Sequence, residues 1–101
     1  MITVKRNNHP AREVRSRHTG EVIRTIPEHY ECGYFYEGRE IARYWSQDDC
    51  LCLRTEYIGC DFKRSAYDRA VSSAKYGEAY QYLFAMLNVD RTSNISEYCF
   101  A

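Results

Sequence analysis

The sequence has few of the features that mark linkers, exported chains and membrane spans. Only two prolines and five glycines occur among its 101 residues, and no Pro/Gly-rich stretch divides it. We expect one domain over residues 1–101, because this length supports a single hydrophobic core. The longest apolar run, residues 82–87, is too short to cross a bilayer. The first residues lack the apolar stretch of a signal peptide. We therefore expect a soluble, cytoplasmic protein with no membrane partner.

The sequence also lacks the pairing of cysteines that a disulfide framework needs. Its five cysteines are an odd number, which indicates free thiols in a reducing compartment. One set of soft side chains has the chemistry of a tetrahedral metal site. It consists of His29, Cys32, Cys50, Cys52 and Cys60. The C-x-x-C pairs typical of structural zinc are missing, and cysteine is among the most buried residue types. We expect these cysteines to fill the core, with no metal and no cofactor; whether the five residues meet in space stays open.

Motifs that position a reacting group are missing as well. There is no G-x-S-x-G, no glycine-rich phosphate loop and no H-E-x-x-H. The sequence therefore predicts no enzyme. A small ribonuclease-like toxin or other enzyme is the third possibility, because Arg15, Arg17, His18, Arg43 and Tyr44 have suitable side chains. Against it, the formal net charge is zero, whereas binding a polyanion favours a strongly basic protein.

The charges that are present are unevenly distributed. Residues 1–24 carry a balance of +4 and the remainder a balance of −4. A basic leading segment can contact nucleic acid or an acidic protein surface, or it can pack against its own acidic body. The candidate contact residues in it are Lys5, Arg6, Arg12, Arg15 and Arg17. A small nucleic-acid-binding protein that uses this segment is our second functional hypothesis.

Period-two patterns dominate the first half of the chain. Residues 1–26 read as a basic N-terminal arm of short strands, with a turn at Thr19-Gly20. Residues 28–59 read as a β-hairpin, which turns at Glu37-Gly38, followed by a third strand. These patterns predict a small antiparallel sheet.

Helical spacing replaces this alternation after residue 60. Residues 61–88 carry an apolar stripe, on which Phe62 lies, and Ser65 has capping-box spacing. Gly77 either kinks one helix or separates two. Residues 95–100 could return as an edge strand. The predicted fold class is α+β, a small antiparallel β-sheet with a C-terminal α-helix packed on one face.

Tyrosine is unusually abundant. Ten tyrosines, four phenylalanines and one tryptophan are too many for the core of so small a domain. Tyr, Trp and Arg carry most of the binding energy at protein interfaces. The predicted partner surface therefore comprises Tyr34, Tyr36, Arg39, Arg43, Tyr44, Trp45, Asp48 and Asp49.

Three parts of the chain resemble segments of small phage and mobile-element proteins: residues 34–42, which end in Ile-Ala, then Leu51 and Leu53, then residues 57–66. In those proteins a strand hairpin precedes a short capped helix. The resemblance implies an accessory protein of the anti-CRISPR kind, and such proteins bind and block a host machine. Our first functional hypothesis is thus a non-enzymatic, phage-type inhibitor that occupies the surface of a host defence or nucleic-acid-processing complex. Its partner would be a host protein or a protein–nucleic-acid complex in the cytoplasm of a host bacterium, and its oligomeric state stays open.

Overall fold

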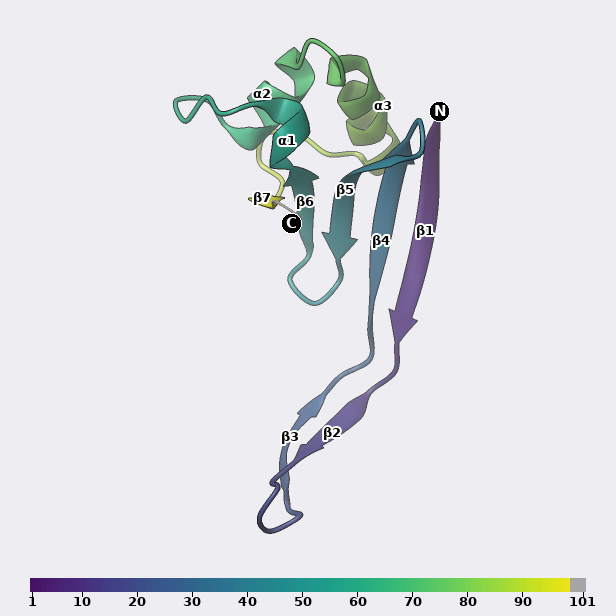
Figure 1. Ribbon diagram of the computed structural model, residues 1–101, viewed down its shortest axis with the longest axis vertical. Helices are drawn as coiled ribbons and strands as arrows, with labels where there is room; N and C mark the ends of the chain where they lie inside the picture. Colours follow the sequence, from purple (N-terminus) through teal and green to yellow (C-terminus); the bar gives the residue numbers. More distant parts are fainter. Residues whose placement is uncertain (99–101) are drawn as a thin grey trace.

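The structure, a computed structural model, describes residues 1–98 as a five-stranded sheet, a two-stranded ribbon and three helices (Figure 1). The strands are β1 (Ile2–His9), β2 (Arg12–Arg15), β3 (Val22–Ile26), β4 (His29–Tyr36), β5 (Arg39–Trp45), β6 (Cys50–Arg54) and β7 (Ile95–Tyr98). The helices are α1 (Thr55–Ile58), α2 (Ala66–Ser72) and α3 (Gly77–Leu87). The predicted α+β class is therefore confirmed.

The larger sheet is mixed and not wholly antiparallel. Its strand order is β1-β4-β5-β6-β7. The first four strands pair antiparallel, but β7 runs parallel to β6, with Leu51 opposite Ile95. A parallel pair needs a long crossover connection instead of a tight turn, and the three helices lie in that connection. The helical segment is consequently followed by a strand and is not C-terminal. Of the expected edge strand over residues 95–100, positions 99 and 100 lie outside the described residues.

Residues 55–58 form a helical turn, although the sequence predicted that the third strand continues through them. Gly59 ends this turn with a φ of +79°, and its N–H donates to the Thr55 carbonyl at 3.2 Å. The turn brings Ile58 into the core, where it is 6% exposed. Period-two alternation continues up to Ile58 in the sequence, so the pattern could not reveal where the strand ends.

Residues 61–88 contain two helices instead of one continuous helix. α2 begins after Ser65, whose Oγ accepts an amide of the first turn at 3.2 Å. α3 begins at Gly77, where a side chain would meet the Val71 carbonyl oxygen at 2.9 Å. The close approach of the two helices therefore requires glycine at this position. Phe62, expected on the apolar stripe, precedes α2 and is 92% exposed.

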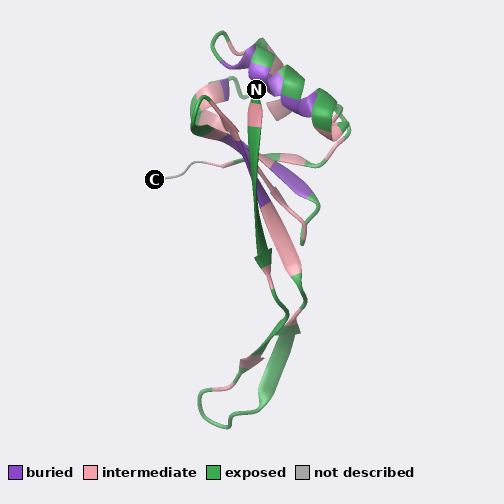
Figure 2. Ribbon diagram, turned by 90° about the vertical axis from the view of Figure 1, so that its right-hand side faces the viewer, coloured by how far each residue is buried: buried purple, intermediate pink, exposed green. Residues whose placement is uncertain are grey.

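The core joins the sheet to the helices. Tyr34, Ala42 and Leu53 are cross-strand neighbours on one face of the sheet. They are buried together with Tyr80 and Leu83 of α3. We call this side of the sheet the core face and the other side the open face. Buried residues gather in the upper half of the molecule (Figure 2).

Beyond the sheet, the β1–β4 hairpin continues as a thin projection over residues 10–28, which we name the arm. It contains β2 and β3, and β1 and β4 close its base with His9 opposite His29. The arm extends the molecule to 54 Å along its longest axis, against 29 and 27 Å along the others. It is almost wholly exposed (Figure 2) and contributes none of the core residues found in positions 1–98.

Candidate functional site

The residues predicted to form one partner surface lie in several places. Tyr34 is 5% exposed on the core face, beside Ala42. Arg43 and Trp45 alternate with Tyr44 along β5, so they emerge on the open face while Tyr44 returns to the core face. The pleat of the strand thus prevents this run of residues from forming one patch.

Tyr36 and Arg39 flank the β4–β5 turn and contact the helices. The Tyr36 ring meets Tyr76 edge-on, with ring centroids 6.2 Å apart. Arg39 donates from Nη1 to the Tyr76 hydroxyl at 3.4 Å. Tyr76 in turn packs on Tyr57 at 4.3 Å. These contacts give the pair a structural role where the β4–β5 turn meets the helices.

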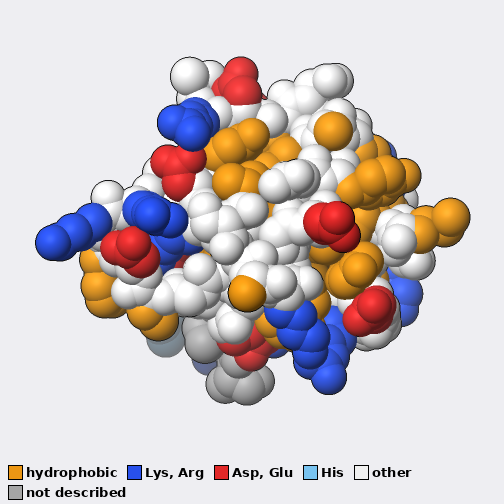
Figure 3. All heavy atoms as spheres, turned by 90° about the horizontal axis from the view of Figure 1, so that it is seen from above, with side chains coloured by type: hydrophobic (Ala, Val, Ile, Leu, Met, Phe, Trp, Pro, Cys, Tyr) orange, Lys and Arg blue, Asp and Glu red, His pale blue; other side chains and the backbone are white. Residues whose placement is uncertain are grey.

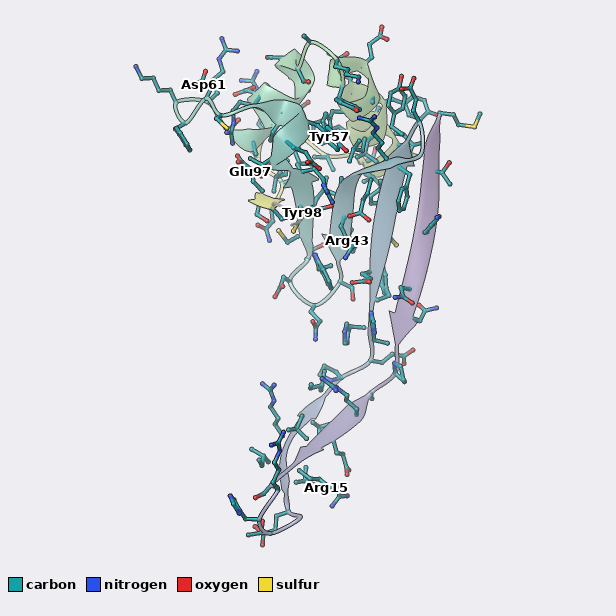
Figure 4. The ribbon with its side chains drawn as sticks, viewed as in Figure 1. Arg15, Arg43, Tyr57, Asp61, Glu97 and Tyr98 are labelled. Carbon is teal, nitrogen blue, oxygen red and sulfur yellow. The ribbon has the colours of Figure 1, made fainter. Side chains whose placement is uncertain are left out.

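A polar network covers part of the open face. Glu40 accepts from Arg43 at 2.8 Å and from the Tyr98 hydroxyl at 2.6 Å. The Arg43 guanidinium lies 5.7 Å from the Trp45 ring. Burial raises the pKa of Tyr98 and keeps its hydroxyl a donor. Arg43 and Tyr98 lie on the body of the molecule, far from Arg15 on the arm (Figure 4). Our sequence reasoning missed Glu40 and Tyr98, because no local pattern shows that β7 returns beside β6.

The predicted basic segment is also divided. Lys5 lies on the open face, 4.7 Å above the Phe35 ring. Arg6, the next residue, lies on the core face, 3.8 Å above the Tyr30 ring. Its other three members, Arg12, Arg15 and Arg17, are exposed on the arm.

Arg15 holds the outer part of the arm together. Its Nη2 contacts Glu13 at 2.6 Å, and its Nη1 donates to the Gly20 carbonyl at 3.0 Å. Two apolar side chains nearby, Val22 and Ile23, are 44% and 67% exposed. The arm therefore presents arginines and aliphatic groups to the surroundings.

A groove of about 460 Å³ opens on the core face. One cross-strand row contributes Arg6, Cys32, Tyr44 and Leu51, from β1, β4, β5 and β6. The other lining residues are Tyr30, Tyr34, Asp49, Leu87, Asn88, Val89, Ser93 and Asn94. The groove thus combines aromatic and aliphatic walls with a few polar groups, as ligand sites usually do.

Two tyrosines of this groove hold their protons strongly. The Tyr44 hydroxyl donates to Asp49 Oδ1 at 2.5 Å, and this bond raises the pKa of Tyr44 to about 12. Burial raises the pKa of Tyr34 to about 12. Both phenols are therefore hydrogen-bond donors at neutral pH. Asp48, also predicted at the partner surface, lies beside them in the β5–β6 turn, where its carbonyl accepts from Asn94.

The soft side chains do not gather into one site. Cys50 and Cys52 lie 3.9 Å apart at their sulfurs on the open face, and Cys32 lies on the core face. Cys60 is exposed, and the His29 ring stacks on His9 at 4.8 Å. Within residues 1–98, no three His, Cys, Asp or Glu side chains are arranged to hold a metal ion.

Apolar side chains also reach the surface at the helix end. Met1 and Tyr82 are 98% and 57% exposed and line a second hollow of about 510 Å³. From this end, hydrophobic side chains appear as separate patches among charged ones (Figure 3).

None of the helices in residues 1–98 has the length and apolar character that crossing a membrane requires. No protein-family model, curated protein or solved structure matches the chain.

Proposed function

We propose that this chain is a non-enzymatic binding protein that occupies the surface of a macromolecular partner with its arm. The observation that carries the proposal is the arm's projection without any contribution to the core. An isolated two-stranded hairpin is only marginally stable in water. Contacts with a partner would account for a segment that adds so little to the protein's own packing.

The chemistry of the arm favours a protein surface. Its charged side chains are Arg12, Glu13, Arg15, Arg17, Glu21, Arg24 and Glu28. Arginine is enriched among the residues that dominate interface energies, and the exposed Val22 and Ile23 add apolar contact area. With the resemblance to phage accessory proteins, this composition supports an inhibitor that blocks a host defence or nucleic-acid-processing complex by occupation.

Direct binding to nucleic acid is the second candidate, because the major groove of DNA admits a two-stranded β-ribbon. The arginines of the arm could contact phosphates. The glutamates count against it, since they repel phosphates and Glu13 already pairs with Arg15.

The test compares the full chain with a variant whose arm is replaced by a tight turn. Because His9 and His29 are paired, an Asn-Gly turn between them closes the hairpin without residues 10–28. We expect this variant to keep its melting temperature but to lose the partner captured from host lysate. Inhibition by the full chain should saturate near one copy per site on the purified partner. Equal capture by both proteins would refute the role of the arm, whereas salt-sensitive, arm-dependent binding to bare duplex DNA would favour the second candidate.

A further inference from the structure

The groove on the core face carries opposite charges at its two ends. Arg6 lies on β1. Asp49 lies in the β5–β6 turn and is bonded to Tyr44 of β5, which is two strands away from β1. Two strand spacings place the backbones that carry Arg6 and Tyr44 about 10 Å apart. A ligand that meets both residues must therefore carry an anionic group and a hydrogen-bond donor on different parts of the molecule.

Arg6 is positioned before any ligand arrives. Its Nε donates to Asn8 Oδ1 at 2.9 Å, and its guanidinium stacks 3.8 Å above Tyr30. None of the ion pairs found among residues 1–98 involves Arg6. Because Arg6 is exposed, its Nη groups are open to an anion from outside the chain.

Asp49 is equally well fixed at the other end. Its Oδ1 accepts from Tyr44, and its carbonyl accepts from Asn94 Nδ2 at 3.3 Å. The Leu51 N–H donates to the Asn94 carbonyl at 3.0 Å, so the α3–β7 connection is tied to this turn. These bonds leave Asp49 Oδ2 to accept a donor from a ligand.

Between the two ends, the groove offers one aromatic face. The Tyr30 and Tyr44 rings are 6.0 Å apart, which is less than the separation of about 7 Å that a planar group needs to stack between two rings. Arg6 already covers Tyr30. A planar ligand group therefore lies against Tyr44, with Leu87 and Val89 beside it.

We propose that the groove binds a cytidine nucleotide through its phosphate and the exocyclic amino group of its base. The phosphate contacts Arg6, the base stacks on Tyr44, and the amino group donates to Asp49. Arginine matches phosphate geometry, bases stack on aromatic rings, and carboxylates accept from the amino group of cytosine. A free α-amino acid fits less well, because its ammonium and its carboxylate are bonded to the same carbon. The site is independent of the arm, since no arm residue lines it.

The experiment titrates the full chain with three probes by isothermal calorimetry and amide NMR. Cytidine monophosphate has both groups, uridine monophosphate lacks the amino group, and cytidine lacks the phosphate. We expect saturable binding of cytidine monophosphate, about tenfold tighter than either of the other probes, because each lacks one charge-assisted hydrogen bond. NMR shifts should map to Tyr44 and to residues 87–94.

Two variants test the assigned roles. Asp49→Asn tolerates the left-handed φ of +47° at this position and should remove the preference for cytidine over uridine monophosphate, because an amide can pair with either base. Arg6→Gln should remove the preference for the monophosphate over the nucleoside. Lys5→Gln is the matched control, because it removes the same charge from the adjacent residue on the open face, and its affinities should be unchanged. Melting temperatures identify any variant that fails to fold.

The proposal is overturned if cytidine monophosphate shows no saturable binding up to about 1 mM. It is also overturned if the folded Asp49→Asn and Arg6→Gln variants keep both preferences, or if Lys5→Gln weakens binding as much as Arg6→Gln. A 5′-phosphorylated oligocytidine distinguishes two possible sources of the bound nucleotide. If it binds more tightly than the mononucleotide, the natural ligand is the 5′ end of a nucleic-acid strand. If it binds more weakly, the natural ligand is a free nucleotide.

Discussion

The Tyr80 hydroxyl donates a hydrogen bond of 2.9 Å to the backbone carbonyl of Ile41, and neither residue is exposed to solvent. Ile41 is the extra residue of a bulge, because Ala42 pairs with Tyr34 while Glu40 pairs with Phe35. The tyrosine thus satisfies a buried carbonyl at an irregular point of the sheet.

Tyr80→Phe should lower the free energy of unfolding by about 1–3 kcal/mol, because it leaves this carbonyl without its side-chain donor. Denaturant unfolding measures the loss. Tyr82→Phe is the matched control on the same helix; since Tyr82 is 57% exposed, its change should stay within about 0.5 kcal/mol. Equal effects of the two substitutions would show that the Tyr80 bond adds nothing to stability.

An ion pair between a buried arginine and an exposed glutamate connects α2 to the last described strand. Arg69, 7% exposed, contacts Glu97 of β7. Replacing Arg69 with Met should destabilise the fold by about 1–3 kcal/mol, because the Glu97 carboxylate loses its counter-charge and the Gly59 carbonyl loses a donor. Arg91→Gln breaks an exposed pair with Asp68 and should cost less than about 1 kcal/mol. A melt in which Arg69→Met matches the wild type would contradict a stabilising role for the pair.

Stability should fall as the pH rises from about 10 to about 12. The folded state raises the pKa of Tyr34 and Tyr44 from 10.0 to about 12, so it binds these protons more tightly than the unfolded chain. This contribution is complete below pH 10 and is lost through pH 12. Ultraviolet titration of phenolate formation, compared with Tyr44→Phe, measures it. Ionisation of the Tyr44 ring near pH 10 in the folded protein would refute the assigned bond to Asp49.

The four cysteines within residues 1–98 should react, relative to one another, in the order of their exposure. Cys60 is exposed, Cys52 is half-buried with its pKa raised by burial, and Cys32 and Cys50 are buried. Alkylation without reductant, followed by peptide mass spectrometry, should therefore label Cys60 first and Cys32 only on unfolding. Cys60→Ser should remove the fast label from its peptide. If two cysteines stay unlabelled and their peptides together weigh two protons less than with free thiols, the pair instead forms a disulfide.

The outer part of the arm should loosen when Arg15 is replaced. Arg15→Ala removes the contacts with Glu13 and the Gly20 carbonyl, so the Ser16 and Gly20 amides should exchange faster with deuterium. Arg17→Ala removes an equal charge from an exposed neighbour and should leave both exchange rates unchanged. The global melting temperature should be the same in both variants, because the arm lies outside the core.

Local chemistry in the sequence accounts for turns, caps and strand faces. Gly20 and Gly38 adopt φ values of +72° and +78°, which glycine reaches without strain, and the chain turns at both. Ser65 caps α2 because a serine hydroxyl can accept an N–H of the first helical turn. Alternation puts Cys32 and Tyr34 on one face of β4 and Gly33 on the other, whatever the fold around them.

Strand neighbours, in contrast, were decided only in the tertiary structure. Nothing near Arg6 or Tyr44 in the sequence indicates that both lie in one row of the sheet, because that row depends on the register of β1, β4 and β5. The parallel return of β7 beside β6 likewise depends on the length of the helical connection. The sequence by itself therefore determined which faces are apolar and where the chain turns, since these follow from side-chain periodicity and backbone preference. Only packing decided which distant side chains share the groove and that the arm stays outside the core.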